Sequence, residues 1–256
     1  MDTQPETVRV RIDLAYDGTG FAGFARQRDQ ITVQGVLEGA LSRVCGGPVE
    51  TVCAGRTDRG VHATAQTIHA DVPPDARLLG DLDRARQGLD KMCGQAITVW
   101  RVRRVPKSFD ARFSATQRRY RYRVCDAVAL NPLERIDTWH LGPPRLDHVA
   151  MEAGGQHLVG EHDFSSFCRR REGEHLVRRI DRLAVRRERA GLIVVAVEGK
   201  AFCHQMVRSV VGCLVAVGQG KRAPDWVAEV RDARDRQAVG RVAPPHGLTL
   251  VGVSYQ

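Results

Sequence analysis

One aspartate, Asp58, stands in a pattern that could make it a nucleophile. It lies in the segment Ala54-Gly55-Arg56-Thr57-Asp58-Arg59-Gly60-Val61-His62-Ala63, with one glycine three residues before it and another two residues after it. Glycines permit positive φ and let a ligand approach the backbone closely. Arg56 and Arg59 flank the carboxylate and favour its charged form. An ionised, positioned carboxylate can attack a sugar carbon or an activated ring carbon.

The same loop also has a purely structural interpretation. An aspartate in a tight turn often accepts hydrogen bonds from backbone amides and takes no part in chemistry. Taken alone, the loop favours that interpretation. The choice between the two depends on the rest of the chain.

The chain is basic, and almost all of its positive charge is arginine. Its 256 residues carry a formal net charge of +9. Two stretches concentrate the arginines, which are Arg112, Arg118, Arg119, Arg121 and Arg123 in the first and Arg169, Arg170, Arg171, Arg178, Arg179, Arg182, Arg186, Arg187 and Arg189 in the second. Guanidinium groups fit phosphates, so the charge favours a nucleic-acid partner. The alternative is an ordinary solvated surface in which arginine replaces lysine.

The composition argues against several other classes of protein. Hydrophobic residues make up 43%, and no apolar run approaches the roughly 20 residues that span a bilayer. No signal peptide is visible at the N-terminus, so we expect a cytoplasmic protein. The seven cysteines are irregularly spaced and form no CxxC, which argues against a disulfide framework and against a metal site. Cys53, Cys203 and Cys213 are predicted to be small buried hydrophobic residues.

Hydrophobic periodicity predicts the same order of elements in each half of the chain. In the first half the predicted elements are a strand over 8–14, a helix over 33–44 between Thr32 and Gly46, strands near 49–54 and 63–71, a helix over 78–92 and a strand over 96–105. In the second they are a strand over 117–125, a helix around 146–158, strands near 177–187 and 192–198, a helix over 203–217, a short helix from Pro224 and a strand over 248–253.

This repeated order predicts an α+β fold. We expect two tandem ferredoxin-like (β-α-β-β-α-β) halves, with antiparallel sheets joined into one central sheet and helices on the outside. The predicted domains are residues 1–106, which carry the Asp58 loop, and residues 107–256.

Six segments, spread over nearly the whole chain, match the pattern of one known family. They are Gly55–His62 (Gly-Arg-Thr-Asp-x-Gly-Val-His), Tyr16–Phe24, Thr32–Glu38, Phe109–Tyr122, Phe202–Arg208 and Ala243–Leu250. In order and approximate spacing they resemble the signature segments of the TruA family of tRNA pseudouridine synthases. The resemblance reverses the balance at Asp58 and favours the catalytic interpretation.

The resemblance implies a role for four residues. Asp58 matches the family's catalytic nucleophile, and Arg56 matches a basic residue of the same loop. Tyr120 matches the tyrosine that stacks on the target base, although a tyrosine on an alternating strand is ordinarily part of a core. Arg208 matches the arginine that pairs with the catalytic aspartate. Its place among apolar residues such as Val207 independently calls for a partner, because a buried charge is costly alone.

The resemblance also implies a reaction. The family isomerises uridine to pseudouridine at nucleotides 38, 39 and 40 in the anticodon arm of tRNA. It uses no cofactor and no metal, it acts as a homodimer on tRNA, and it has no membrane partner. Whether Asp58 attacks the sugar or the base stays open.

The chain departs from the family pattern at three places. Phe21 and Phe24 stand where tyrosine and tryptophan are usual, the stretch 88–97 lacks the customary Asn-x-x-Leu-Pro-x-Asp-Ile, and a short arginine run follows Cys168. These departures lie outside the matched catalytic positions and bear on the path of the RNA.

Two other classes of function compete with an enzyme. A non-catalytic RNA-binding protein with tandem sheets would show an aromatic-rich RNP1 strand in each half, and neither half has one. A structural dimerisation module would not explain an arginine-flanked aspartate in a glycine-bounded loop.

Overall fold

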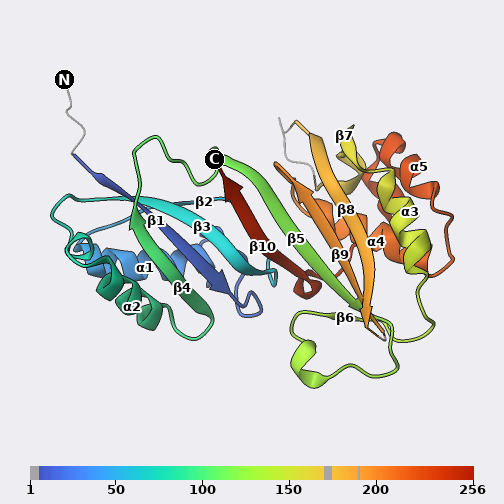
Figure 1. Ribbon diagram of the computed structural model, residues 1–256, viewed down its shortest axis with the longest axis horizontal. Coiled ribbons are helices and arrows are strands. Elements are labelled where there is room, and N and C mark those ends of the chain that lie inside the picture. The colour runs from blue at the N-terminus through green and yellow to red at the C-terminus, as the bar shows by residue number, and fades with distance from the viewer. Residues whose placement is uncertain (1–5, 170–174, 190) are drawn as a thin grey trace. The chain divides into compact units, whose positions relative to one another are not determined.

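The computed structural model describes residues 6–169, 175–189 and 191–256 (Figure 1). Arg170 and Arg171 of the second arginine stretch therefore lie outside the described residues. The fold is mixed α+β, with helices and mostly antiparallel strands. Two compact units are present, Met1–Thr116 with Leu250–Gln256 and Gln117–Thr249. In the described ranges, no helix is long and apolar enough to cross a membrane.

The first unit has the predicted order of elements. They are β1 (Val8–Tyr16), α1 (Val33–Cys45), β2 (Thr51–Cys53), β3 (His62–Val72), the 3-10 helix η1 (Arg77–Leu79), α2 (Leu82–Cys93) and β4 (Ile97–Arg104). The strand order is β4-β1-β3, and β2 pairs with the other edge of β3, all antiparallel. The strand β10 (Leu248–Tyr255), of which the residues from Leu250 belong to this unit, follows β3 in the order.

The local signals at α1 act as the sequence predicts. Thr32 is the N-cap, and its Oγ1 accepts from the Gly35 amide at 3.2 Å. Gly46 ends the helix with φ of 76°, a conformation that glycine adopts without strain. The second helix begins later than predicted, at Leu82, because the Asp81 side chain accepts from the Arg84 amide and caps it there. Figure 1 shows α1 and α2 together on one face of this unit's strands.

The second unit adds elements that the sequence did not predict. Its elements are β5 (Ala115–Cys125), η2 (Pro132–Glu134), β6 (Trp139–His140), α3 (His148–Gln156), β7 (Gly160–Asp163), η3 (Ser165–Phe167), β8 (Val177–Arg189), β9 (Leu192–Gly199), α4 (Met206–Gly218), α5 (Trp226–Ala233), η4 (Arg236–Val239) and η5 (Pro245–Gly247). The strand order is β5-β9-β8-β7, with β6 parallel to β5. The strands β6 and β7 are too short to show an alternating pattern.

The main helix of the second unit, α4, starts three residues after its predicted start at Cys203. Gln205 stands before it with φ of 65° and ψ of 3°, in the left-handed region, so a continuous helix from Cys203 is ruled out. Most of α4 is buried. Its burial explains why its sequence is apolar on nearly every side.

A disulfide joins Cys168 and Cys203, with the two Cα atoms 5.7 Å apart. The irregular cysteine spacing argued against a disulfide framework, so this bridge corrects the sequence analysis for that pair. The two residues are 35 positions apart, and only the tertiary fold brings them together. The predicted burial of Cys53, Cys203 and Cys213 is confirmed.

Candidate active site

The loop that carries Asp58 connects β2 to β3. Thr57 is buried, Asp58 is half-buried, and Arg56 and Arg59 are exposed. The Val61 amide donates to the Asp58 carbonyl at 3.1 Å and closes a turn. Gly60 within that turn has φ of 74°, which explains why a glycine stands two residues after Asp58.

Buried polar side chains lie beneath this loop. The Gln66 side chain is completely buried, and its Nε2 donates to the Gly55 carbonyl at 2.7 Å. The hydroxyls of Tyr16 and Thr57 are 2.8 Å apart in a buried hydrogen bond. Sequence reasoning assigned no role to Gln66 or Tyr16, and only the position of Tyr16 at the head of a matched segment marked it.

A second loop, residues 17–24, packs against the Asp58 loop. The Phe24 amide donates to the Thr57 carbonyl at 3.0 Å. A Cβ on Gly18 would come within 2.1 Å of the Val61 carbonyl oxygen, so only glycine fits this contact. The Gly18 amide donates to Nδ1 of His62 at 3.0 Å, which gives His62 a structural role in joining the loops.

The two phenylalanines that depart from the family pattern are core residues. Phe21 and Phe24 are buried, and the Phe24 ring lies 6.1 Å from that of Tyr16 between centroids.

One arginine of the Asp58 loop bonds to a neighbouring segment. Arg59 donates to Oε1 of Gln30 at 2.9 Å, and this bond joins the loop to residues 25–32.

Tyr120 lies on β5 in the second unit. Its side chain is only 8% exposed, and its ring meets the Phe202 ring edge-on, with centroids 5.1 Å apart and planes at 84°. The ring thus has one flank fixed by Phe202 just before α4. The burial agrees with a core position, and the predicted stacking of Tyr120 on the target base stays a prediction.

Arg208 lies in the first turn of α4. It is half-buried, and its Nε donates to the Ala243 carbonyl at 2.8 Å, while the Ala243 amide donates to the Arg208 carbonyl at 3.1 Å. The first bond orients the guanidinium, and the second joins the two backbones. Its predicted ion pair with Asp58 stays a prediction.

Two further polar residues of the second unit escaped sequence reasoning. Tyr122 is completely buried and donates to the Pro244 carbonyl at 2.7 Å, and burial raises the pKa of its hydroxyl. Arg236 donates to Ser209 Oγ at 2.7 Å and to Gln205 Oε1 at 3.1 Å, and burial lowers the pKa of its guanidinium. Their partners are distant in sequence, so no local pattern marked them.

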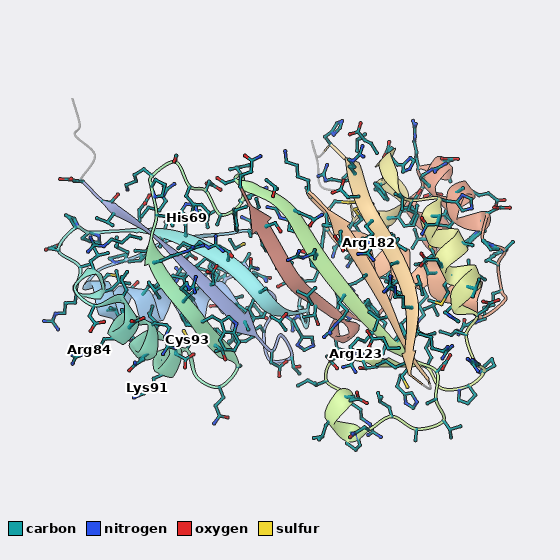
Figure 2. The ribbon with its side chains drawn as sticks, in the orientation of Figure 1. His69, Arg84, Lys91, Cys93, Arg123 and Arg182 are labelled. Carbon is teal, nitrogen blue, oxygen red and sulfur yellow. A yellow bond between two sulfur atoms is a disulfide. The ribbon has the colours of Figure 1, made fainter. Side chains whose placement is uncertain are left out.

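Several arginines of the two stretches have acidic partners. Arg123 on β5 pairs with Glu134 at 2.9 Å, and Arg182 on β8 pairs with Glu198 at 3.4 Å (both arginines are labelled in Figure 2). Arg187 forms a buried bidentate pair with Asp126. Part of the arginine content is therefore structural. In the portion of the chain that the structure describes, no group of three or more His, Cys, Asp or Glu residues could hold a metal ion.

A family profile described as tRNA pseudouridine synthase matches residues 14–121 and 155–256, which include Asp58, Tyr120 and Arg208. The chain belongs to the tRNA pseudouridine synthase family. This membership makes it an enzyme of the isomerase class.

Relatives within the family match over nearly the full length. The tRNA pseudouridine synthase A of Frankia casuarinae is 51% identical over 97% of this chain and 89% of its own length. That of Leifsonia xyli subsp. xyli is 42% identical over 98% of this chain and 92% of its own. A solved structure, of an archaeal box H/ACA sRNP Nop10-Cbf5 complex, shows a likeness too weak to carry an argument, with a TM-score of 0.36 at 8% identity over 80% of this chain and 43% of that one.

Proposed function

We propose that this pseudouridine synthase isomerises uridine at nucleotides 38, 39 and 40 in the anticodon arm of tRNA, with Asp58 as its nucleophile and without a cofactor. The observation that carries the proposal is the half-buried carboxylate of Asp58 on a loop held by buried hydrogen bonds and by a second loop. A carboxylate fixed in this way suits covalent catalysis better than a role in a solvent-exposed turn.

The reaction exchanges one bond to the ribose for another. The bond between N1 of uracil and C1′ breaks, a bond between C5 and C1′ forms, and the proton lost from C5 is balanced by one gained at N1. Asp58 holds either the sugar carbon or the uracil ring while the base turns. The target base leaves its stack first, at a cost that an aromatic surface at Tyr120 offsets.

Arg208 and Arg56 complete the proposed site. Arg208 pairs with the Asp58 carboxylate, and Arg56, which is exposed on the same loop as Asp58, is the second basic catalytic residue. A guanidinium fork matches a carboxylate in a two-bond geometry that lysine cannot reproduce. Arg208→Ala should therefore lose both activity and stability, whereas Arg208→Lys should keep the charge and lose the geometry. A distance beyond 4 Å between guanidinium and carboxylate in an experimental structure of the complex contradicts the pair.

The finer description of the fold and assembly belongs to the same proposal. The element order supports tandem ferredoxin-like halves, with the catalytic groups divided at residues 106 and 107. The enzyme acts in the cytoplasm as a homodimer, and exposed arginines such as Arg119 and Arg169 contact the phosphate backbone. Reversing the charges at positions 169–171 should weaken tRNA binding and its salt dependence. Equal affinity for wild type and variant would argue against that contact.

The direct test is conversion of a tRNA transcript with uridines at nucleotides 38, 39 and 40. Pseudouridine is mapped by carbodiimide modification and primer extension, beside a transcript in which cytidine replaces the three uridines. We expect modification at those nucleotides and none in the control. Modification elsewhere, or binding of the transcript without conversion, contradicts the proposed site choice.

A further inference from the structure

The loop that carries Asp58 lies outside regular secondary structure. Its neighbouring strands end at Cys53 and begin at His62, and the residues between belong to neither. Backbone hydrogen bonds hold it, from the Ala54 amide to the Thr67 carbonyl, from the Phe24 amide to the Thr57 carbonyl and from the Val61 amide to the Asp58 carbonyl. A carboxylate that must reach a reacting carbon has to be positioned accurately, because a displacement of about 1 Å can lower the rate about 100-fold.

We infer that Tyr16 and Gln66 are positioning residues, which hold the Asp58 loop in its reactive geometry through a buried chain of hydrogen bonds that ends on Thr57. This inference rests on the proposed role of Asp58. Neither Tyr16 nor Gln66 reaches the substrate in it, and both act through the residues beside Asp58.

The orientation of Gln66 is fixed by its neighbours. Its Oε1 accepts from the amides of Thr67 at 3.2 Å and of Gly55 at 3.4 Å. Its Nε2 must then be the donor toward the Gly55 carbonyl at 2.7 Å and the Tyr16 hydroxyl at 3.4 Å. Gln66 thus binds both polar groups of Gly55, three residues before Asp58.

The chain of bonds continues from Tyr16 to Thr57. The Tyr16 hydroxyl accepts from Gln66 Nε2 at 3.4 Å and shares a hydrogen bond with Thr57 Oγ1 at 2.8 Å, in which either hydroxyl could donate, and linked bonds of this kind strengthen one another. Thr57 is next to Asp58 and only 7% exposed. The residue before the nucleophile is therefore fixed at its side chain by Tyr16 and at its carbonyl by Phe24.

Removing a hydroxyl from either end of the Tyr16–Thr57 bond gives a test with little change of shape. The variants are Tyr16→Phe, Thr57→Val and their double mutant, with Thr57→Ser to restore the hydroxyl. Thr51→Val is the matched control, because its buried Oγ1 bonds to Glu38 at 3.0 Å, away from the loop.

We expect Tyr16→Phe and Thr57→Val each to lower kcat about tenfold, with KM changed less than about twofold. The kcat of the double mutant should be no lower than that of the less active single variant. Thr57→Ser and Thr51→Val should keep kcat within about twofold of wild type. Additive losses in the double mutant, an equal loss in Thr51→Val or no recovery in Thr57→Ser would overturn the inference.

A second measurement separates this inference from the proposed nucleophile. Amide hydrogen exchange is followed at Phe24 and Val61, which donate to the carbonyls of Thr57 and Asp58, in wild type and Tyr16→Phe without tRNA. We expect faster exchange in the variant at both amides, and unchanged exchange overturns the positioning role. If Asp58→Asn keeps its turnover, the nucleophile proposal fails, and the exchange result still decides whether Tyr16 holds the loop.

Discussion

The two units hold their candidate catalytic groups by different means. In the first unit Asp58 lies on an irregular loop, which neutral hydrogen bonds and close glycine contacts hold in place. In the second unit Tyr120 and Arg208 lie on a regular strand and a buried helix. That second unit also contains a buried ion pair between Asp126 and Arg187.

This difference predicts which substitutions should lower the free energy of unfolding and which should lower kcat. Removing one partner of a buried charge pair lowers stability because the other charge is left buried alone. A loop held by directional bonds and steric fit controls the position of one carboxylate. Changes at the ion pair should therefore lower stability with little change in kcat, and changes at the loop should lower kcat.

The largest expected loss of stability is in Asp126→Asn. The Asp126 carboxylate accepts two bonds from Arg187, at 2.7 and 3.0 Å, and the variant leaves a guanidinium buried without its counter-charge. We expect the free energy of unfolding, measured in urea, to fall by about 3–5 kcal/mol with little change in kcat. Asp181→Asn, at an exposed pair with Arg179, is the control and should change it by less than about 1 kcal/mol. Equal losses in the free energy of unfolding for the two variants would contradict the special cost of breaking the buried pair.

A smaller loss of stability but a larger loss of rate is expected in Gly18→Ala. The added Cβ would meet the Val61 carbonyl at 2.1 Å and push the two loops apart. We expect a loss of about 1–3 kcal/mol together with a fall in kcat. Gly20→Ala is the matched control, since nothing lies within 4 Å of its Cβ. Equal kcat values for Gly18→Ala and Gly20→Ala would contradict the claim that the contact between the two loops controls the rate.

The Asp126–Arg187 ion pair should also affect how stability depends on pH in acid. Burial raises the pKa of Asp126, but the bonds from Arg187 and the Leu146 amide outweigh it, and the net pKa is lowered. Its contribution is therefore complete above the unfolded value of about 3.9 and is lost as the pH falls through the lower folded value. Hydrogen bonds from Arg9 lower the pKa of Asp71 to about 2, so this residue titrates in the same range. In unfolding measurements from pH 5 to 2, Asp126→Asn should flatten the slope without abolishing it. An unchanged slope contradicts this.

The smallest effect is expected at the N-cap of α1. Thr32→Ala removes the Oγ1 acceptor for the Gly35 amide and should cost about 1 kcal/mol, and Thr32→Ser should restore most of it. Because the Thr32 Oγ1 bonds to an amide of α1 itself, kcat should stay within about twofold of wild type. A tenfold loss of kcat would mean that any weakening of the first unit disturbs Asp58.

The sequence predicted the elements whose signals are local. The alternation in β1 and the caps of α1 were visible because the residues that create them are neighbours. The short strands β6 and β7 were missed because two to four residues carry no period. The late start of α4 depends on the left-handed backbone at Gln205, which its sequence does not demand.

At the site, motifs located the loop but not what holds it. Asp58 was found through the string from Gly55 to His62. Gln66 and Tyr16 were missed because their bonds to the loop join residues that are 11 and 41 positions apart. The Tyr122 hydroxyl bonds to a carbonyl 122 positions away. Such contacts arise only once the strands are paired.

The measurement that tests the central claim most directly is turnover by Asp58→Asn. The variant keeps the shape of the side chain and removes its nucleophilic charge. We expect purified Asp58→Asn to bind tRNA with an affinity close to that of wild type and to form no pseudouridine at nucleotides 38, 39 or 40. Residual turnover above about 1% of wild type would contradict the account, because a covalent step cannot proceed at that rate without its nucleophile.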